Sequence, residues 1–310
     1  MYKLLAILFA PFLLCSNTAA EAAVSQEPQP VIESLMVGTA RFELQFAPGF
    51  NAAGRREARE WIDRSAHVVA AYFGGFPVPN TTILIIPVDG DTVKSGTTFN
   101  GPNLHIHVRV GRDITHAKYL ADWIMVHEMV HLAIPEVPRN QNWFHEGVAT
   151  YVEIISRAQA GLTGSKGGWA ELSRNVGQGM PAENDRGLDH TPTWGRTYWG
   201  GALFCMLADV ELRKRSNNRV GLQHALRGIV KRGGNYGVAW PLKQTIRIAD
   251  EATGLTVLSE LYNRMKDDPS PPDLAGVWRD LGILSDQSGV RLSDDAPLIA
   301  IRRAITKPNS

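Results

Sequence analysis

Cysteine is scarce in this sequence, since only Cys15 and Cys205 among its 310 residues are cysteines. A surplus of charge of one sign is also missing: 32 basic residues face 31 acidic ones, for a formal net charge of +1. Without a basic surplus no long-range field attracts nucleic acid, so we expect no nucleic-acid partner. The chain is 44% hydrophobic and 20% charged. This balance is typical of a globular protein with a sizeable core.

Long apolar segments are lacking too. The run at residues 4–14 follows Lys3, precedes the small residues at 19–23, and is too short to span a bilayer. This layout is typical of a secretory signal peptide. We predict a signal peptide at residues 1–23 and an exported protein, periplasmic or extracellular, with no stable membrane insertion after cleavage. Removal of the signal peptide would leave Cys205 as the only cysteine and exclude an intrachain disulfide.

Residues 24–118 mix strand and helix signals. The alternating RFELQF (41–46) predicts a strand, and residues 51–77 predict a helix with an apolar side. TILIIPV (82–88) is apolar enough for a central strand, whereas NLHIHVRV (103–110) alternates and suits a sheet edge. Residues 88–103 between them are rich in Gly, Asp, Thr and Asn, which predicts a loop.

Helical patterns dominate from about residue 115. We predict helices at the HEMVH segment, at 143–160, at 197–215, and within 220–232, 241–252, 255–265 and 273–282. The expected fold class is α+β, with a small N-terminal mixed sheet that has an edge strand and an all-α C-terminal part. The expected organisation is 24–118 for the α/β part, 119–215 for the helical core and 216–310 for the C-terminal helices.

The segment HEMVH places two histidines four residues apart. On a helix His127 and His131 share one face and can direct both imidazoles at one metal ion. Glu128 lies about 100° round the helix, where it can take a proton from a metal-bound water. The motif alone is only moderately specific, because buried histidines paired with carboxylates would give the same letters. A catalytic zinc site further requires a third ligand on an adjacent element.

The segment NWFHEGVATYVE offers two candidates for that ligand. Pro135 and Pro138 would end the first helix and let the chain double back, so that the two helices become antiparallel neighbours. Glu146 then falls near the start of the second helix, and Glu153 lies seven residues later on nearly the same face.

HExxH followed by W-x-x-E-G-x-A-x-Y resembles the gluzincin metallopeptidases, the thermolysin-like and aminopeptidase-like group within the peptidase MA-like superfamily. The resemblance implies thermolysin-like active-site helices and one Zn²⁺ per chain on His127, His131 and Glu146, with Glu128 as general base. His145 then becomes a structural or rim residue. Glu153 is expected to accept the outer N–H of a metal-bound histidine. The gap of 14 residues (132–145) between His131 and Glu146 is shorter than in the best-known members.

A second segment, TYWGGALFCMLADVELRKR, is similar to a helix of the glycyl-aminopeptidase-like enzymes, without their PDZ-like module. The resemblance gives Tyr198 a catalytic role, with its hydroxyl donating to the developing oxyanion. One such preorganised donor contributes about 3 to 4 kcal/mol to transition-state stabilisation. The alternative is that Tyr198 only packs beside Trp194 and Trp199 at a helix start.

Substrate-side signals are weaker. In gluzincins an edge strand before the zinc helix pairs with the substrate, and the resemblance gives this role to NLHIHVRV. His105 and His107 share a face of that strand, where we expect exposed residues rather than a second metal site. Many aminopeptidases of the superfamily carry a Gly-Ala-Met-Glu-Asn type segment nearby, whose glutamate holds the substrate amine. SGTTFNGPN contains no acidic residue, which puts exopeptidase activity in doubt.

The sequence thus predicts an exported zinc metallopeptidase, aminopeptidase-like or endopeptidase, acting on a peptide or protein substrate. A zinc-binding protein that keeps the peptidase fold as a peptide-binding scaffold, with little turnover, is the alternative. A structural protein with a coincidental motif is disfavoured, because three separate segments agree.

Overall fold

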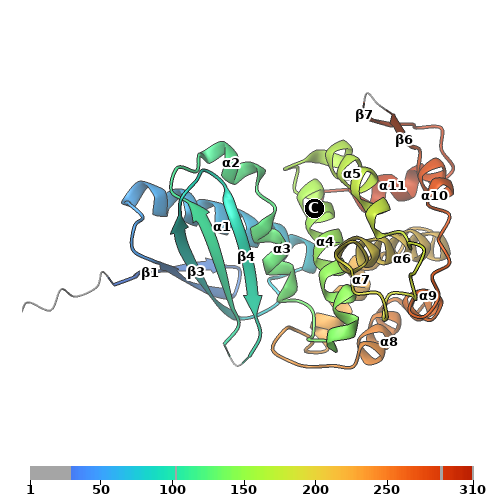
Figure 1. Cartoon of the computed structure of the whole chain (residues 1–310), viewed down its shortest axis with the longest axis horizontal. Helices are drawn as coiled ribbons and strands as arrows, with labels where there is room; N and C mark the ends of the chain where they lie inside the picture. The colour runs from blue at the N-terminus through green and yellow to red at the C-terminus, as the bar shows by residue number, and fades with distance from the viewer. Residues whose placement is uncertain (1–28, 102, 287–288, 309–310) are drawn as a thin grey trace, which may run out of the picture.

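The computed structural model of the chain describes residues 29–101, 103–286 and 289–308. A sheet formed near the N-terminus lies on one side of the molecule and a body of helices lies on the other (Figure 1). The predicted α+β class is confirmed. The predicted signal peptide at residues 1–23 lies outside the described residues. No described helix combines the length and the hydropathy that crossing a membrane requires.

The sheet has five strands in the order β1-β2-β3-β5-β4. Their bounds are β1 (Val31–Val37), β2 (Ala40–Phe46), β3 (Asn80–Val88), β4 (Val93–Phe99) and β5 (His105–Gly111). β2, β3 and β5 run parallel, while β1 and β4 add antiparallel strands at the two edges. The sheet is therefore mixed, as predicted.

Strict alternation of side chains decides which face of the sheet is buried. Phe42, Leu44, Ile83, Ile106 and Val108 all point to one face and are fully buried. The helix α1 (Ala52–Phe73) packs its apolar side into the same core. It begins where the Asn51 side chain accepts from the Gly54 N–H and ends at Gly74, whose φ of 78° suits glycine.

The predicted sheet edge is wrong. β5, which contains HIHVRV of the segment NLHIHVRV, is an interior strand paired on both sides, and β4 from the predicted loop 88–103 forms the edge. The Thr and Phe residues of β4 suit a strand. The Gly, Asp and Asn residues next to β4 favour a loop and outweigh that signal. β4 pairs with the side of β5 that β3 does not occupy, and this side exists only in the folded sheet.

The helices follow the predictions closely. They are α2 (His116–Ala121), α3 (Ile124–His131), α4 (Asn142–Gln159), α5 (Gly164–Asn175), α6 (Gly201–Ser216), α7 (Leu222–Lys231), α8 (Leu242–Thr253), α9 (Val257–Met265), α10 (Leu274–Leu281) and α11 (Ile299–Ile305). Every predicted helix is present, while α5, α11, the strand β1 and a separate helix α2 were not predicted. A hairpin of β6 (Ile283–Asp286) and β7 (Gly289–Leu292) interrupts the helices of the C-terminal part.

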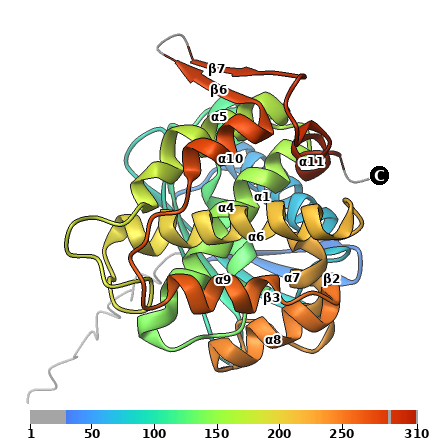
Figure 2. The ribbon, with the colours of Figure 1, turned by 90° about the vertical axis from the view of Figure 1, so that its right-hand side faces the viewer.

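The helix α4 lies at the centre of the helical body. All its residues except Asn142 and Glu146 are buried, and α6 crosses it on the side away from the sheet (Figure 2). The crossing is close because two glycines meet: a Cβ added at Gly147 would overlap the backbone of Gly201. Contact between backbones fixes the relative position of the two helices.

A buried carboxylate ties the helices around α4 together. Asp209 on α6 accepts hydrogen bonds from the Tyr151 hydroxyl at 2.9 Å, the Arg213 Nε at 2.8 Å and the backbone N–H of Leu222 at 3.0 Å. The charge is paired and fully hydrogen-bonded, which is what a buried carboxylate needs. One side chain thus connects α4, α6 and α7.

Candidate metal centre

The helix α3 carries two histidines one turn apart. His127 and His131 are 5% and 6% exposed, and their ring centroids lie 4.8 Å apart. Met125, Val126, Met129 and Val130 of α3 are apolar and buried in the core, so the helix that carries both imidazoles is held by packing. The predicted helical face is confirmed.

The helix α4 brings a carboxylate to the same point. Glu146 Oε2 lies 3.4 Å from the Nε2 atoms of both His127 and His131. Among the described residues this is the only group of three such side chains whose ligand atoms converge, all within 4.8 Å of one another. Ligands about 2.0 to 2.1 Å from a tetrahedral zinc are about 3.3 Å apart, so the two spacings between Glu146 and the histidines fit that ion.

The short gap between the two helices does not prevent this convergence. The chain turns at residues 132–134, continues through Pro135 and Pro138, and makes a single 3-10 turn (Arg139–Gln141) before α4 begins. Glu146 then lies on the second turn of α4, next to the Gly147–Gly201 contact that positions this helix. The geometric doubt raised by the 14-residue gap is thereby removed.

Burial and the interactions among the three side chains shift their pKa values in opposite directions. Burial favours the neutral carboxyl of Glu146, but the two imidazoles outweigh it and hold its pKa well below the usual range. Burial lowers the pKa of His127. Burial also acts to lower the pKa of His131. The hydrogen bond to Glu146 and the charge of that carboxylate outweigh burial, so the pKa of His131 is raised. A cation at this point would take over the role that protonated imidazole plays for Glu146.

Glu128 faces the wall made by β4. The Thr98 hydroxyl lies 2.6 Å from Glu128 Oε2 and 2.8 Å from its backbone oxygen, and donates to them. A Cβ added at Gly96 would lie 2.8 Å from Glu128 Oε1, so only glycine leaves room for the carboxylate. Neither Gly96 nor Thr98 was found from the sequence, because the only signal was a glycine and a threonine in an apparent loop.

Glu153 does not take its expected role. Its carboxylate accepts from Arg157 at 2.7 Å, and the outer Nδ1 atoms of His127 and His131 have no protein partner. Burial raises the pKa of Glu153 to about 8 despite that cation. Glu153 also lies outside the converging group, so the structure places it as the partner of Arg157. The reason is the helix itself, on which Arg157 is the i+4 neighbour of Glu153.

Tyr198 lies beside His127, one of the three converging side chains. It belongs to a single π-helical turn (Arg196–Gly200) that leads into α6, and its ring stacks parallel to His127 with centroids 6.3 Å apart. Such turns are frequent at functional sites. Burial and the charges of Glu146 and Glu128 raise the pKa of Tyr198 to about 12. Its hydroxyl therefore stays protonated, and able to donate, throughout the neutral range.

Three adjoining cavities surround these residues. The central one, about 200 Å³, is lined by His127, Glu128, His131, Glu146 and Tyr198 together with residues 96–98, Asn142, His145 and Tyr236. A cavity of about 980 Å³ shares Asn142, His145 and Tyr236 with it, and a third of about 130 Å³ shares His127 and Tyr198. The cavity beside His127, His131 and Glu146 is thus bordered by two others.

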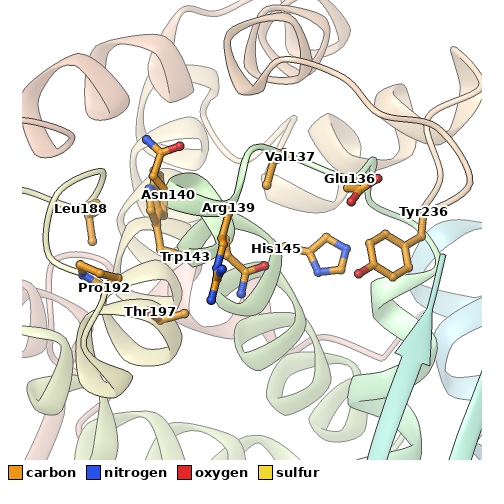
Figure 3. A pocket seen from close by; sticks show the side chains of 11 residues that line it. Glu136, Val137, Arg139, Asn140, Trp143, His145, Leu188, Pro192, Thr197 and Tyr236 are labelled. Carbon is orange, nitrogen blue, oxygen red and sulfur yellow. The ribbon is translucent and has the colours of Figure 1, made fainter.

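Tyr236 is a residue at this site that the sequence did not indicate. It follows α7 in a glycine-rich loop, and its N–H donates to Leu132 O just after α3. Its ring packs against His145 at 4.4 Å, and His145 stacks on His131 at 4.4 Å (Figure 3). His145 is 3% exposed and outside the converging group, in agreement with its expected structural role.

The other histidine pair lies elsewhere. His105 and His107 are on the face of β5 opposite the core, where the Phe99 ring packs against them at 4.8 and 4.7 Å. Neither belongs to a described group of three possible ligands. The pair forms an aromatic patch on the sheet.

Comparison with known proteins places the fold. No protein-family model and no curated protein sequence matches the chain. Among solved structures it is similar to an aminopeptidase N family protein from Idiomarina loihiensis, with a TM-score of 0.59 and 14% identity over 86% of this chain and 53% of that one. It is also similar to an M1 zinc metallopeptidase from Deinococcus radiodurans, with a TM-score of 0.51 and 16% identity over 79% and 52%.

A variant of the Deinococcus enzyme bound to a Tyr-Ser-Ala substrate gives the same TM-score of 0.51, at 15% identity over 79% of this chain and 53% of that one. Our chain spans about half the length of these structures. At such identities the likeness concerns the fold. The chain therefore has a fold like that of M1 zinc metallopeptidases, and the three side chains that could hold a metal lie within it.

Proposed function

We propose that this protein is a zinc-dependent peptidase. The observation that carries the proposal is the convergence of His127, His131 and Glu146, whose ligand atoms lie within 4.8 Å of one another, with Glu128 in the same cavity. The M1 metallopeptidase-like fold supports it. Zinc in this position would lower the pKa of a bound water towards about 7 and polarise a carbonyl oxygen.

Two side chains of the protein would carry out the proton transfers and the charge stabilisation. Glu128, held by Thr98, takes the proton of the attacking water and later delivers it to the leaving amine. Tyr198 donates its hydroxyl proton as a hydrogen bond to the carbonyl oxygen as negative charge develops there. The raised pKa of Tyr198 keeps this donor available at neutral pH.

The strand β4 would align the substrate. It is an edge strand, and its residues 96–98 form one wall of the central cavity. An extended peptide that pairs with such an edge places its backbone along the wall and one carbonyl at the metal-binding face. The tripeptide substrate in the Deinococcus structure supports a peptide as the class of substrate.

The test combines hydrolysis of a peptide mixture with metal analysis. Glu128→Gln should bind one zinc per chain and lose nearly all activity, whereas Glu183→Gln, at an exposed residue outside the three cavities, should keep both. Glu146→Ala should lose zinc, while Glu153→Gln should retain it. Full activity of Glu128→Gln would refute the proposed base. Stoichiometric zinc with no hydrolysis by the unmodified protein would favour the scaffold function instead.

We also propose that the protein is exported, on the basis of residues 1–23. Expression of the full chain in a bacterial host, with mass measurement of the protein from the periplasm and medium, tests this. A mature chain shortened by about the length of the signal peptide is expected. An unprocessed chain confined to the cytoplasm would refute export.

A further inference from the structure

The cavities beside the metal-binding face leave room for a chain on both sides of a cleaved bond. The central cavity borders the large cavity at His145 and Tyr236, and the small one at His127 and Tyr198. A carbonyl positioned at His127 and His131 would therefore have a neighbouring cavity on each of these two borders. Figure 3 shows that the large cavity extends from His145 and Tyr236 as far as Leu188 and Pro192.

An exopeptidase recognises a chain end through its charge. A free α-ammonium next to the cleaved bond needs an acidic partner within the central cavity, because a desolvated charge is costly without one. Among the described residues that line this cavity, the acids are Glu128 and Glu146 alone. The first is the proposed base and the second is held by both histidines, so neither is free for an ammonium group.

Acids in the flanking cavities do not supply this partner. Glu153 and Glu171 line the small cavity, but both face the same cation, Arg157, at 2.7 and 3.6 Å. Glu136 in the large cavity is exposed at its rim. The same holds for a carboxyl terminus next to the cleaved bond. The described lining of the central cavity contains neither lysine nor arginine, and Arg139 in the large cavity is exposed.

The small cavity instead suits an uncharged side chain. Its walls include Trp123, Trp194 and Trp199, and the first two are 46% and 61% exposed. Exposed indole rings at a cavity are typical of binding surfaces for bulky side chains. A volume of about 130 Å³ accommodates one side chain next to the cleaved bond.

From these observations we infer that the site hydrolyses internal peptide bonds and requires no free chain end. The substrate class is an extended polypeptide that continues in both directions from the cleaved bond. This inference rests on the proposed peptidase function and specifies its substrate.

The experiment compares blocked and free chain ends in one peptide library. Lysine side chains are blocked throughout, the library is divided, and the α-amines of one half are acetylated. Mass spectrometry of the zinc-loaded protein's products should show internal cuts in both halves, with rates for matched peptides within about threefold. Glu128→Gln serves as the blank for contaminating peptidases.

Each outcome has a distinct meaning. Stepwise loss of single residues from the amino terminus, or cleavage at least about tenfold faster in the free half, would overturn the inference while leaving the peptidase proposal intact. Cleavage of neither half would overturn the peptidase proposal itself. Glu136→Gln should leave the ratio of the two rates unchanged; a ratio that depends on Glu136 would identify it as an amine anchor and also overturn the inference.

Discussion

Replacing Gly96 by alanine tests how the proposed base is positioned. The added Cβ would overlap Glu128 Cγ, its nearest atom, and would lie 2.8 Å from Glu128 Oε1 and 2.9 Å from Glu128 Cδ. Carbon contacts are favourable at about 3.5 to 4.0 Å, so the carboxylate must move by roughly 1 Å. A displacement of this size at a catalytic group costs about 100-fold in rate, which corresponds to about 2.7 kcal/mol of activation free energy.

The same substitution should leave the metal ligands and the fold in place. The nearest atoms to the added Cβ all belong to the Glu128 side chain, which can swing aside, and none belongs to a proposed ligand. We therefore expect a kcat about 100-fold lower at unchanged zinc content and unchanged melting temperature. Steady-state kinetics, metal analysis and thermal unfolding measure the three quantities.

Gly177→Ala is the matched control, because a Cβ there would meet no atom within 4 Å and the residue lies away from the central cavity. Its kcat should equal that of the unmodified protein. An undiminished kcat of Gly96→Ala would refute the idea that close approach of β4 positions the base. Loss of zinc would show instead that β4 supports the metal ligands.

Four further substitutions test other parts of the structure. Thr98→Val removes the hydroxyl that donates to the base, so kcat/KM should fall about tenfold at constant zinc content, and an unchanged value would contradict the contact. Tyr198→Phe should lower kcat about 100- to 1000-fold with little change in KM. Because the pKa of Tyr198 is raised to about 12, the unmodified enzyme should lose no activity through ionisation of this hydroxyl in the neutral range. An effect of Tyr198→Phe on kcat smaller than about tenfold would leave Tyr198 a packing residue. Asp209→Ala leaves three buried donors unpaired and should cost about 3 to 5 kcal/mol of unfolding free energy in denaturant titrations, against less than about 1 kcal/mol for Glu211→Ala at an exposed ion pair; equal costs would contradict this. Trp194→Ala should reduce cleavage about tenfold next to bulky side chains but not next to small ones, and a uniform effect would remove it from the side-chain cavity.

Much of the fold follows from local patterns. The alternation in RFELQF, the apolar TILIIPV and the helical periods of the later segments were correctly interpreted, because each records a face that is buried in the core. The strand β4 was missed because an edge strand with exposed alternate residues has little apolar signal. Its position depends on pairing with β5, and β5 is itself held in place by pairing with β3 in the folded sheet.

Part of the candidate site also follows from local sequence, and part depends on tertiary packing. The HExxH spacing by itself determines that His127 and His131 share a helical face with Glu128 beside it, because that relation is built into the geometry of one helix. The choice between Glu146 and Glu153 depends on where α4 crosses α3 and α6, and thus on the backbone contact between Gly147 and Gly201.

The placement of Thr98, Gly96 and Tyr236 comes from strands and loops that are far from the motif in sequence. Only tertiary structure brings them to the cavity, because their local sequence carries no feature that encodes the approach. The sequence by itself therefore determines the two histidines, the adjacent glutamate and the helices that carry them. Packing between distant segments decides that Glu146 is the carboxylate that converges on the histidines, that Gly96 and Thr98 contact Glu128, and which shape the central cavity has.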